Sequence, residues 1–198
     1  MINGEPEIVM IGLITMSKNV GKRFEEDVKS SIPDYCLLIR LPDPPHSFTK
    51  RSDTRFSIKN PCDYILFDSS SKTLFPIELK TTKYKSISFE GIDGDDNESR
   101  MVHKHQILGL LEMSKYDGVN AGFIFNFRDE KNNMERTYFQ DIKSFVDMIK
   151  NIDKHSFNEL DLLTNNAKRI NGEKKRVRYR WDFDSFFKDM NGCKLVCE

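Results

Sequence analysis

Two short apolar runs joined by a small polar turn predict a β-hairpin in the first half of the chain. The first run covers residues 62–68 and the second covers residues 74–80, with Ser-Ser-Ser-Lys-Thr between them. Their length and apolar content are typical of strands. Since side chains alternate between the two faces of a strand, Glu78 and Lys80 project from the same face. The hairpin can bring Asp63, in the first run, beside this pair.

The apolar positions elsewhere predict helices and further strands around the hairpin. Apolar residues three or four apart indicate helices over residues 19–31, 103–116 and 141–151. Apolar runs indicate strands over residues 35–41, 121–127 and 134–139. Three phenylalanines between residues 183 and 187 indicate a short terminal helix that docks on the core. The resulting order of helix, three strands, helix and strand predicts a compact mixed α/β fold.

The length of 198 residues suits one domain with a real core. We expect residues 1–16 to form an N-terminal extension or arm and residues 17–152 to form the core. Within the core, residues 42–61 are polar and basic, and they predict a short insertion or stalk-like loop. Residues 153–198 predict a basic C-terminal extension that ends in the short helix.

Charge becomes informative only through its distribution. The formal net charge is +0, because 31 basic residues balance 31 acidic ones. Seven of the thirteen residues from 168 to 180 are basic, however, and a second basic cluster lies between residues 50 and 59. Such runs suit contacts with phosphates. The alternative is that each run is a solvated loop.

The cysteine pattern indicates a reducing, intracellular setting, and we expect a cytoplasmic protein. The four cysteines form no Cys-x-x-Cys pair and no zinc-type set with histidines. Cys36 and Cys62 lie in apolar runs that predict buried thiols. The apolar segment of residues 8–16 is too short to span a bilayer, so we expect no membrane partner.

Asp63, Glu78 and Lys80 together predict chemistry on a phosphate. Two carboxylates and one ammonium that converge can hold a hard divalent cation, Mg²⁺ or Mn²⁺, beside a phosphate group. Lys83 and Lys85 follow at once and can contact further phosphates. This is the chemistry of a metal-dependent nuclease. The alternative is that the carboxylates face solvent or that Glu78 only pairs with Lys80.

The order of elements, with Asp63 and Glu78-x-Lys80 on the second and third strands, resembles the PD-(D/E)XK nuclease superfamily. The chain more closely resembles RecU-type Holliday junction resolvases of Gram-positive bacteria and their phages. An Asn-x-Gly motif at residues 19–21, followed by a Glu-rich helix, looks like the opening of that family. His105-Gln106 looks like its helix start after the catalytic strands, and an Asp-Gly pair precedes the next strand as in the family. The resemblance covers about residues 17–150.

The resemblance implies a restriction-endonuclease-like αβββαβ core, with a mixed central sheet flanked by helices. It implies a catalytic set of Glu25, Asp63, Glu78, Lys80 and Gln106. Mg²⁺, or Mn²⁺ in its place, would be held by Asp63, Glu78 and the backbone carbonyl of Leu79. Glu25 would hold the cation through a water molecule, with Glu26 as the alternative. Lys80 would orient the attacking water and stabilise the transition state.

The resemblance and the basic runs also indicate the residues that would contact DNA. These are Lys50, Arg51, Arg55, Lys83, Lys85, His105, Lys174, Lys175, Arg176, Arg178 and Arg180. The implied partner is branched double-stranded DNA, cut by a homodimer whose two sites make paired nicks and leave 5′-phosphate and 3′-hydroxyl ends. A recombinase is a further partner that the resemblance allows.

The stretch of residues 42–61 is shorter than the stalk that RecU proteins insert into the junction, which fits a short phage-encoded member.

Two alternatives to a junction resolvase remain open. A restriction- or repair-type endonuclease of the same superfamily would carry the same residues. A DNA-binding accessory protein of recombination, with a non-catalytic acidic site, is the third interpretation.

Overall fold

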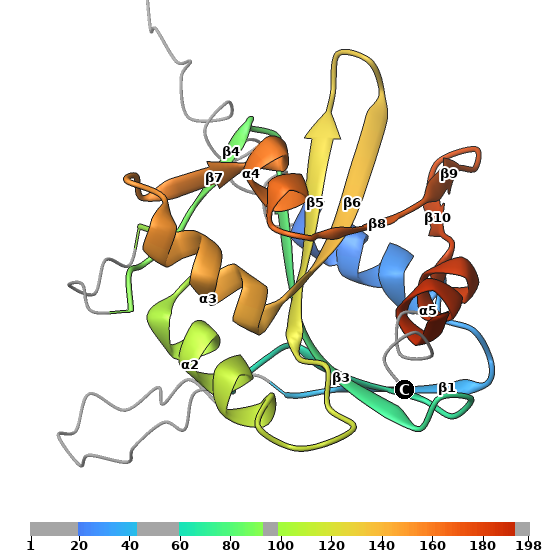
Figure 1. Ribbon diagram of the computed structural model, residues 1–198. Coiled ribbons are helices and arrows are strands. Elements are labelled where there is room, and N and C mark those ends of the chain that lie inside the picture. The colour runs from blue at the N-terminus through green and yellow to red at the C-terminus, as the bar shows by residue number, and fades with distance from the viewer. Residues whose placement is uncertain (1–19, 43–59, 93–98, 193–198) are drawn as a thin grey trace, which may run out of the picture.

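A computed structural model of the chain describes residues 20–42, 60–92 and 99–192 (Figure 1). The predicted arm and the basic residues Lys50, Arg51 and Arg55 lie outside these ranges. Within them, six strands form the main sheet, in the order β1-β2-β3-β5-β6-β8. The strands are β1 (Cys36–Arg40), β2 (Tyr64–Asp68), β3 (Thr73–Thr82), β5 (Gly122–Asp129), β6 (Met134–Asp141) and β8 (Lys168–Ile170).

The directions of the strands give the mixed sheet that the sequence predicts. β1, β2 and β3 pair antiparallel, β3 and β5 pair parallel, and β6 pairs antiparallel with both β5 and β8. A helix at residues 20–29 precedes β1, and α2 (Lys104–Met113) lies between β3 and β5 in the sequence. The predicted αβββαβ core is therefore confirmed. A parallel pair needs such a crossover, because a tight turn can only return the chain antiparallel.

The turn of the central hairpin is built by its own polar residues. The carboxylate of Asp68 accepts hydrogen bonds from the backbone and hydroxyl of Ser70, at 2.9 and 2.6 Å, and from the hydroxyl of Ser71, at 2.5 Å. Lys72 takes up a left-handed conformation, with φ of 57°. Local bonds of this kind favour turns over continued strand. They set the register in which Tyr64 lies opposite Ile77.

Helices cover both faces of the sheet (Figure 1). On one face, α2 and α3 (Ile142–Asn151) pack over β5, and their buried residues include Ile107, Leu110 and Phe145. On the other face, the helix at residues 20–29 and α5 (Phe183–Gly192) form a second cluster around Phe75. The terminal helix that the phenylalanines predict is thus confirmed.

The segment after residue 152 holds more structure than its polar composition indicates. It forms β7 (Ser156–Asn158), α4 (Glu159–Thr164), β8, β9 (Gly172–Lys174) and β10 (Tyr179–Trp181) before α5. β7 pairs with β4 (Ser86–Ser88), β8 joins the edge of the main sheet, and β9 and β10 form a hairpin of their own. Strands of three residues leave too short a pattern to be predicted from alternation.

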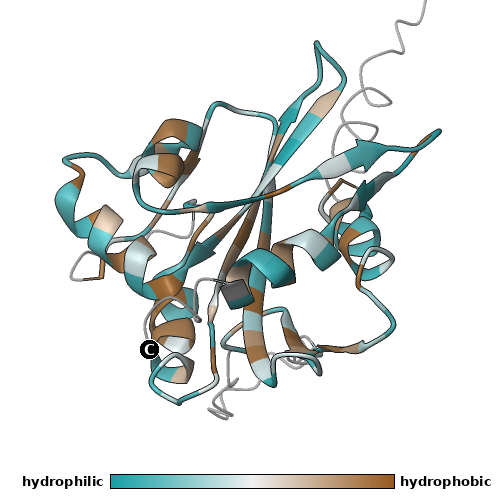
Figure 2. Ribbon diagram, turned by 45° about the vertical axis from the view of Figure 1, so that its right-hand side comes forward, coloured by the Kyte–Doolittle hydropathy of each residue, from teal (hydrophilic) through white to brown (hydrophobic). Residues whose placement is uncertain are grey.

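Hydrophobic residues concentrate on the strands and on the helix sides that face them, while the tip of the β5–β6 hairpin is hydrophilic (Figure 2). Cys62 is buried, as predicted. The prediction that Cys36 is buried is wrong: its thiol is only half-buried, because β1 is an edge strand. In the described part of the chain, no helix is both long and apolar enough to cross a bilayer.

Candidate active site

The site is centred on Glu78 and Lys80 of β3, an inner strand paired with β2 and β5. Glu78 is 4% exposed, and the Lys80 ammonium lies 3.0 Å from its Oε1 atom. Leu79, between them, points to the opposite face and joins the cluster around Phe75. The predicted alternation of side chains along this strand is therefore what the structure shows. Because Glu78 is buried, the alternative that its carboxylate faces solvent is wrong.

Asp63 is held beside Glu78 by the backbone of the neighbouring strand. Its Oδ2 atom accepts the N–H of Leu79 at 2.8 Å, and its own N–H donates to the carbonyl of Ile77 at 3.1 Å. These two bonds extend the β2–β3 ladder by one residue and direct the Asp63 side chain across the strand. The hairpin brings the two predicted metal ligands together in this way.

Gln106 reaches the site from the first turn of α2. It is buried, and its Nε2 atom donates to Glu78 Oε1, which thus has both Lys80 and Gln106 as partners. The predicted grouping of Asp63, Glu78, Lys80 and Gln106 is present in the structure. Their catalytic roles stay predictions.

The electrostatics of the site follow from burial and from the second carboxylate. Burial raises the pKa of Glu78 to about 7; the Lys80 ammonium opposes this rise, and the neighbouring Asp63 carboxylate adds to it. A buried carboxylate whose pKa is raised by a second carboxylate is a site where a divalent cation can replace the proton.

The donor set fits a hard cation such as Mg²⁺, since it offers carboxylate oxygens and no soft ligand. Among the described residues, no group of three or more His, Cys, Asp or Glu side chains has the geometry of a metal site. The side chains of Asp63 and Glu78 would therefore leave positions for backbone, water or phosphate oxygens. The carbonyl of Leu79 stays a predicted third ligand.

Glu25 belongs to a different neighbourhood. Its Oε2 atom accepts from the hydroxyl of Tyr64 at 3.3 Å and lies 3.7 Å from Nε of Arg40. Tyr64 packs in the cluster around Phe75, on the face of the sheet opposite to Glu78. Together with Lys22 and Lys29, these residues line a hollow of about 520 Å³. The predicted role of Glu25 at the metal, through a water molecule, stays a prediction.

Glu26, the alternative to Glu25, is engaged in an ion pair. It accepts from Arg178 at 2.7 Å, and Arg178 also donates to the buried carboxylate of Asp27 at 3.1 Å. This pair joins the helix at residues 20–29 to the β9–β10 hairpin. Glu26, the alternative metal ligand, therefore has a structural role as the partner of Arg178.

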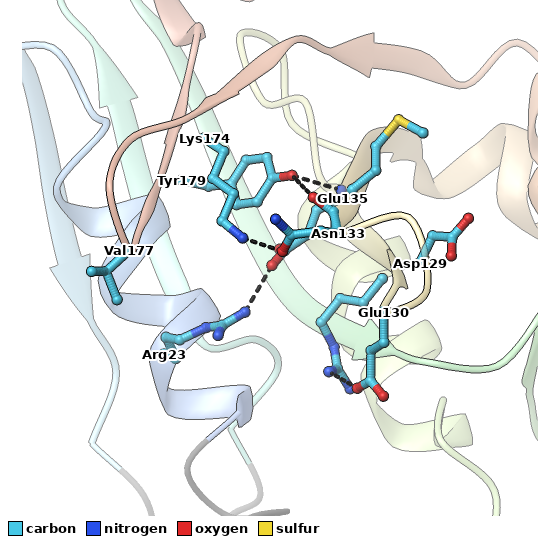
Figure 3. A pocket seen from close by; sticks show the side chains of 10 residues that line it. Arg23, Asp129, Glu130, Asn133, Glu135, Lys174, Val177 and Tyr179 are labelled. Carbon is cyan, nitrogen blue, oxygen red and sulfur yellow. Dashed lines mark hydrogen bonds and ion pairs between the residues drawn. The ribbon is translucent and has the colours of Figure 1, made fainter.

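The basic run of the C-terminal segment is partly used inside the molecule. Beside Arg178, Lys175 pairs with Glu173 at 2.5 Å and Arg180 donates to the hydroxyl of Ser30. Lys174 donates to Asn133 at a pocket of about 180 Å³, where Arg23 pairs with Glu135 at 2.7 Å (Figure 3). Arg176 is exposed and lies between Lys175 and Arg178 in the sequence. The predicted contacts of the run with DNA stay predictions, and the cations of this pocket already have polar partners.

Three other predicted DNA contacts lie near the site in the sequence or in space. Lys83 and Lys85 are exposed just after β3, and the Lys83 ammonium lies 5.6 Å from the centre of the Tyr84 ring. His105 is half-buried, and its ring stacks on that of His103, with centroids 5.6 Å apart. Sequence reasoning missed two groups here: His103 and the buried carboxylate of Glu90, which lies 3.0 Å from it. The first histidine of the His-x-His-Gln stretch is the signal for His103, and the sequence holds none for Glu90.

Comparison with known proteins places the chain in a family. No family model matches it. The SPbeta prophage-derived uncharacterized protein YotM of Bacillus subtilis strain 168 is 32% identical over 142 residues, which are 71% of this chain and 67% of that protein. The chain belongs to the YotM family. Since this YotM relative is described as uncharacterized, membership brings no activity with it.

A solved structure also resembles the chain. Archaeoglobus fulgidus Hjc, a Holliday junction resolvase from an archaeal hyperthermophile, gives a TM-score of 0.45 at 16% identity, over 73% of this chain and 93% of that one.

Proposed function

We propose that this member of the YotM family is a Mg²⁺-dependent endonuclease that hydrolyses phosphodiester bonds in DNA. The observation that carries the proposal is the convergence of Asp63, Glu78 and Lys80, with the Lys80 ammonium 3.0 Å from Glu78 Oε1. The buried Glu78 carboxylate, with a second carboxylate and a cation beside it, suits a divalent metal ion and a phosphate better than it suits stability alone, since burying charge is costly.

The residues of the site would divide the work as follows. Asp63 and Glu78 hold the cation, which when bound supplies charge neutralisation for the phosphate and lowers the pKa of bound water. Lys80 orients the attacking water and stabilises negative charge that develops on the phosphate. Gln106 keeps Glu78 Oε1 in a fixed position through its amide. Hydrolysis leaves a 5′-phosphate and a 3′-hydroxyl.

The proposed substrate is a four-way DNA junction, cut by a homodimer. The support for this finer proposal is the set of RecU-like motifs in the order found here, together with the prophage origin of YotM, which fits a phage-encoded enzyme. A two-fold axis would place two copies of the site on strands of like polarity, so that paired nicks resolve the junction.

A cleavage assay with a matched control tests the proposal. Wild type, Asp63→Asn and Asp147→Asn would be compared on a labelled four-way junction, a fork and a linear duplex, with and without Mg²⁺. Asp147 is an exposed residue of α3, so its variant makes the same chemical change away from the site. We expect symmetric nicks on the junction by wild type and Asp147→Asn only, and only with Mg²⁺.

Other outcomes select the alternatives. Equal cutting of the linear duplex would contradict junction selectivity and favour a restriction- or repair-type endonuclease. An absence of cutting with any divalent cation, while both wild type and Asp63→Asn bind the junction, would contradict the nuclease and favour an accessory protein.

A further inference from the structure

A buried carboxylate outside the predicted catalytic set lies against the start of α2. Glu90 is 6% exposed and follows β4 in the chain. Its Oε2 atom accepts the backbone N–H of Lys104 at 2.6 Å, and its Oε1 atom lies 3.0 Å from Nδ1 of His103. Because a carboxylate accepts hydrogen bonds, Nδ1 of His103 carries the proton in this contact.

The backbone reinforces the attachment. The N–H of Glu90 donates to the carbonyl of Val102 at 2.9 Å, and the N–H of Val102 donates to the carbonyl of Ser88 at 3.0 Å. Two backbone bonds and two side-chain contacts thus join residues 88–90 to residues 102–104. The first turn of α2 is therefore held by residues 88–90 as well as by its own capping bond from the His103 N–H to Gln106.

This attachment determines how the amide of Gln106 is oriented. Its Oε1 atom accepts the backbone N–H of His103 at 3.0 Å, and its Nε2 atom donates to Glu78. A backbone N–H can only donate, so the amide oxygen must face His103 and the amide nitrogen must face Glu78. The position of the His103 backbone therefore decides which end of the amide the catalytic carboxylate meets.

The same attachment supports His105. Its ring stacks on that of His103 at an interplanar angle of 13°, and His103 is held by Glu90. His105, a predicted contact with the DNA backbone, and Gln106, the partner of the predicted metal ligand, thus both depend on the buried carboxylate of Glu90.

We propose that Glu90 is a positioning residue of this site. It acts through His103 and the first turn of α2 to present the Gln106 amide to Glu78 and the His105 ring to DNA. The effect on cleavage rests on the proposed nuclease function, whereas the effect on Gln106 rests on these contacts alone.

Single-turnover cleavage with saturating enzyme tests the effect on catalysis. Glu90→Gln keeps the shape of the side chain but offers one acceptor oxygen in place of two. We expect its rate constant to fall about 10- to 100-fold, as for other groups that orient a metal ligand. Its affinity for the junction in Ca²⁺ should fall much less, because His105 is only one of many predicted DNA contacts. Glu112→Gln is the matched control: Glu112 is an exposed residue of the same helix, paired with Lys115, and this variant should cut at the wild-type rate.

A double-mutant cycle separates positioning from general damage to the fold. If Glu90 acts through Gln106, Glu90→Gln should add little further loss in a Gln106→Ala background. Losses that multiply, or a wild-type rate in Glu90→Gln, would overturn the proposal. If Glu90→Gln fails to fold, His103→Gln takes its place in the same cycle, since it removes the ring contact and leaves the Glu90–Lys104 bond.

NMR of the metal-free protein tests the effect of Glu90 on Gln106 without DNA, and therefore independently of the proposed nuclease function. The side-chain NH₂ signals of Gln106 in metal-free protein can be assigned by their loss in Gln106→Ala. We expect them to shift and to exchange faster with water in Glu90→Gln but not in Glu112→Gln. Unchanged signals in Glu90→Gln would refute the positioning role even if wild type cuts junctions. Changed signals in a protein that cuts no DNA would refute only the nuclease.

Discussion

The ammonium of Lys80 lies 3.0 Å from Oε1 of Glu78, and their side chains are only 16% and 6% exposed. The two residues occupy alternate positions of one strand, so the backbone itself sets their approach. Such a pair is costly to bury, because both charges lose their hydration. Its position next to a second carboxylate, Asp63, is better explained by chemistry than by stability.

Replacement of Lys80 should separate catalysis from DNA binding. In Lys80→Met, we expect the single-turnover cleavage rate to fall at least about 100-fold, the size of effect usual for a group that assists proton transfer. Since Lys80 lowers the pKa of Glu78, its loss should move that pKa above about 7. Cleavage assays and ¹³C NMR titration of the Glu78 carboxyl group check the two results. Lys115→Met, which removes an exposed surface partner of Glu112, is the control and should leave both unchanged.

The raised pKa of Glu78 should make the metal-free protein less stable at high pH. The pKa rises from the ordinary value of 4.5 to about 7 on folding, so between these values the folded state holds a proton that the unfolded state has lost. The contribution of Glu78 is therefore largest below pH 4.5 and is lost as the pH rises to about 7, on the order of 3 kcal/mol in total.

Urea unfolding at pH 5 and pH 8, without divalent cations, measures this contribution. The pKa of Glu135 is also raised by burial, so wild type must be compared with Glu78→Gln rather than with itself. We expect wild type to lose more stability than the variant between the two pH values. Equal losses would show that Glu78 ionises in the folded state as it does in water.

Binding of Mg²⁺ should stabilise the protein, and more so at high pH. A proton and a cation compete for Glu78, so the increase in melting temperature on adding Mg²⁺ should be larger at pH 8 than at pH 6. Asp63→Asn should abolish most of the increase, while Asp147→Asn should keep it. Differential scanning calorimetry at constant ionic strength checks this, and an equal increase in Asp63→Asn would place the cation elsewhere.

Arg178 and Arg176, both in the basic run, should have different roles, the first in stability and the second in DNA binding. Arg178 bonds to Glu26 and to buried Asp27, so Arg178→Ala should lower the melting temperature. Exposed Arg176 should contribute to DNA binding instead: Arg176→Ala should leave the melting temperature unchanged and reduce the slope of log Kd against log salt concentration by about 1. Fluorescence anisotropy over a salt series measures the slope, and an unchanged slope would remove Arg176 from the interface.

The sequence predicts those parts of the site that local rules control. Alternation along β3 places Glu78 and Lys80 on one face, and the hairpin turn adds Asp63; Gln106 came from the motif resemblance. Contacts between distant segments were not predictable in this way. Arg178 meets Glu26 across 152 positions, and Glu90 meets Lys104 across a loop whose composition gives no sign of it. β4 and β7 pair over three residues each, which is too short for a periodic pattern.

The approach of α2 to the hairpin depends on a glycine. A Cβ atom at Gly109 would lie 2.8 Å from both Cα and Cβ of Pro61, and Pro61 precedes Cys62 and Asp63 in the chain. In Gly109→Ala the helix must move away from the hairpin, which would draw Gln106 from Glu78 and slow cleavage. The helix-propensity gain of about 1 kcal/mol from glycine to alanine would not compensate for the lost packing, so we expect the free energy of unfolding to fall as well.

Gly21, in the helix at residues 20–29, gives the matched comparison for Gly109. A Cβ atom there would have no neighbour within 4 Å, so Gly21→Ala should raise the free energy of unfolding by roughly 0.5–1 kcal/mol through helix propensity alone. Urea unfolding of the two variants should therefore give changes of opposite sign. If both alanine variants were stabilised, α2 would have room to stay in place, and the contact with Pro61 would not control the position of Gln106.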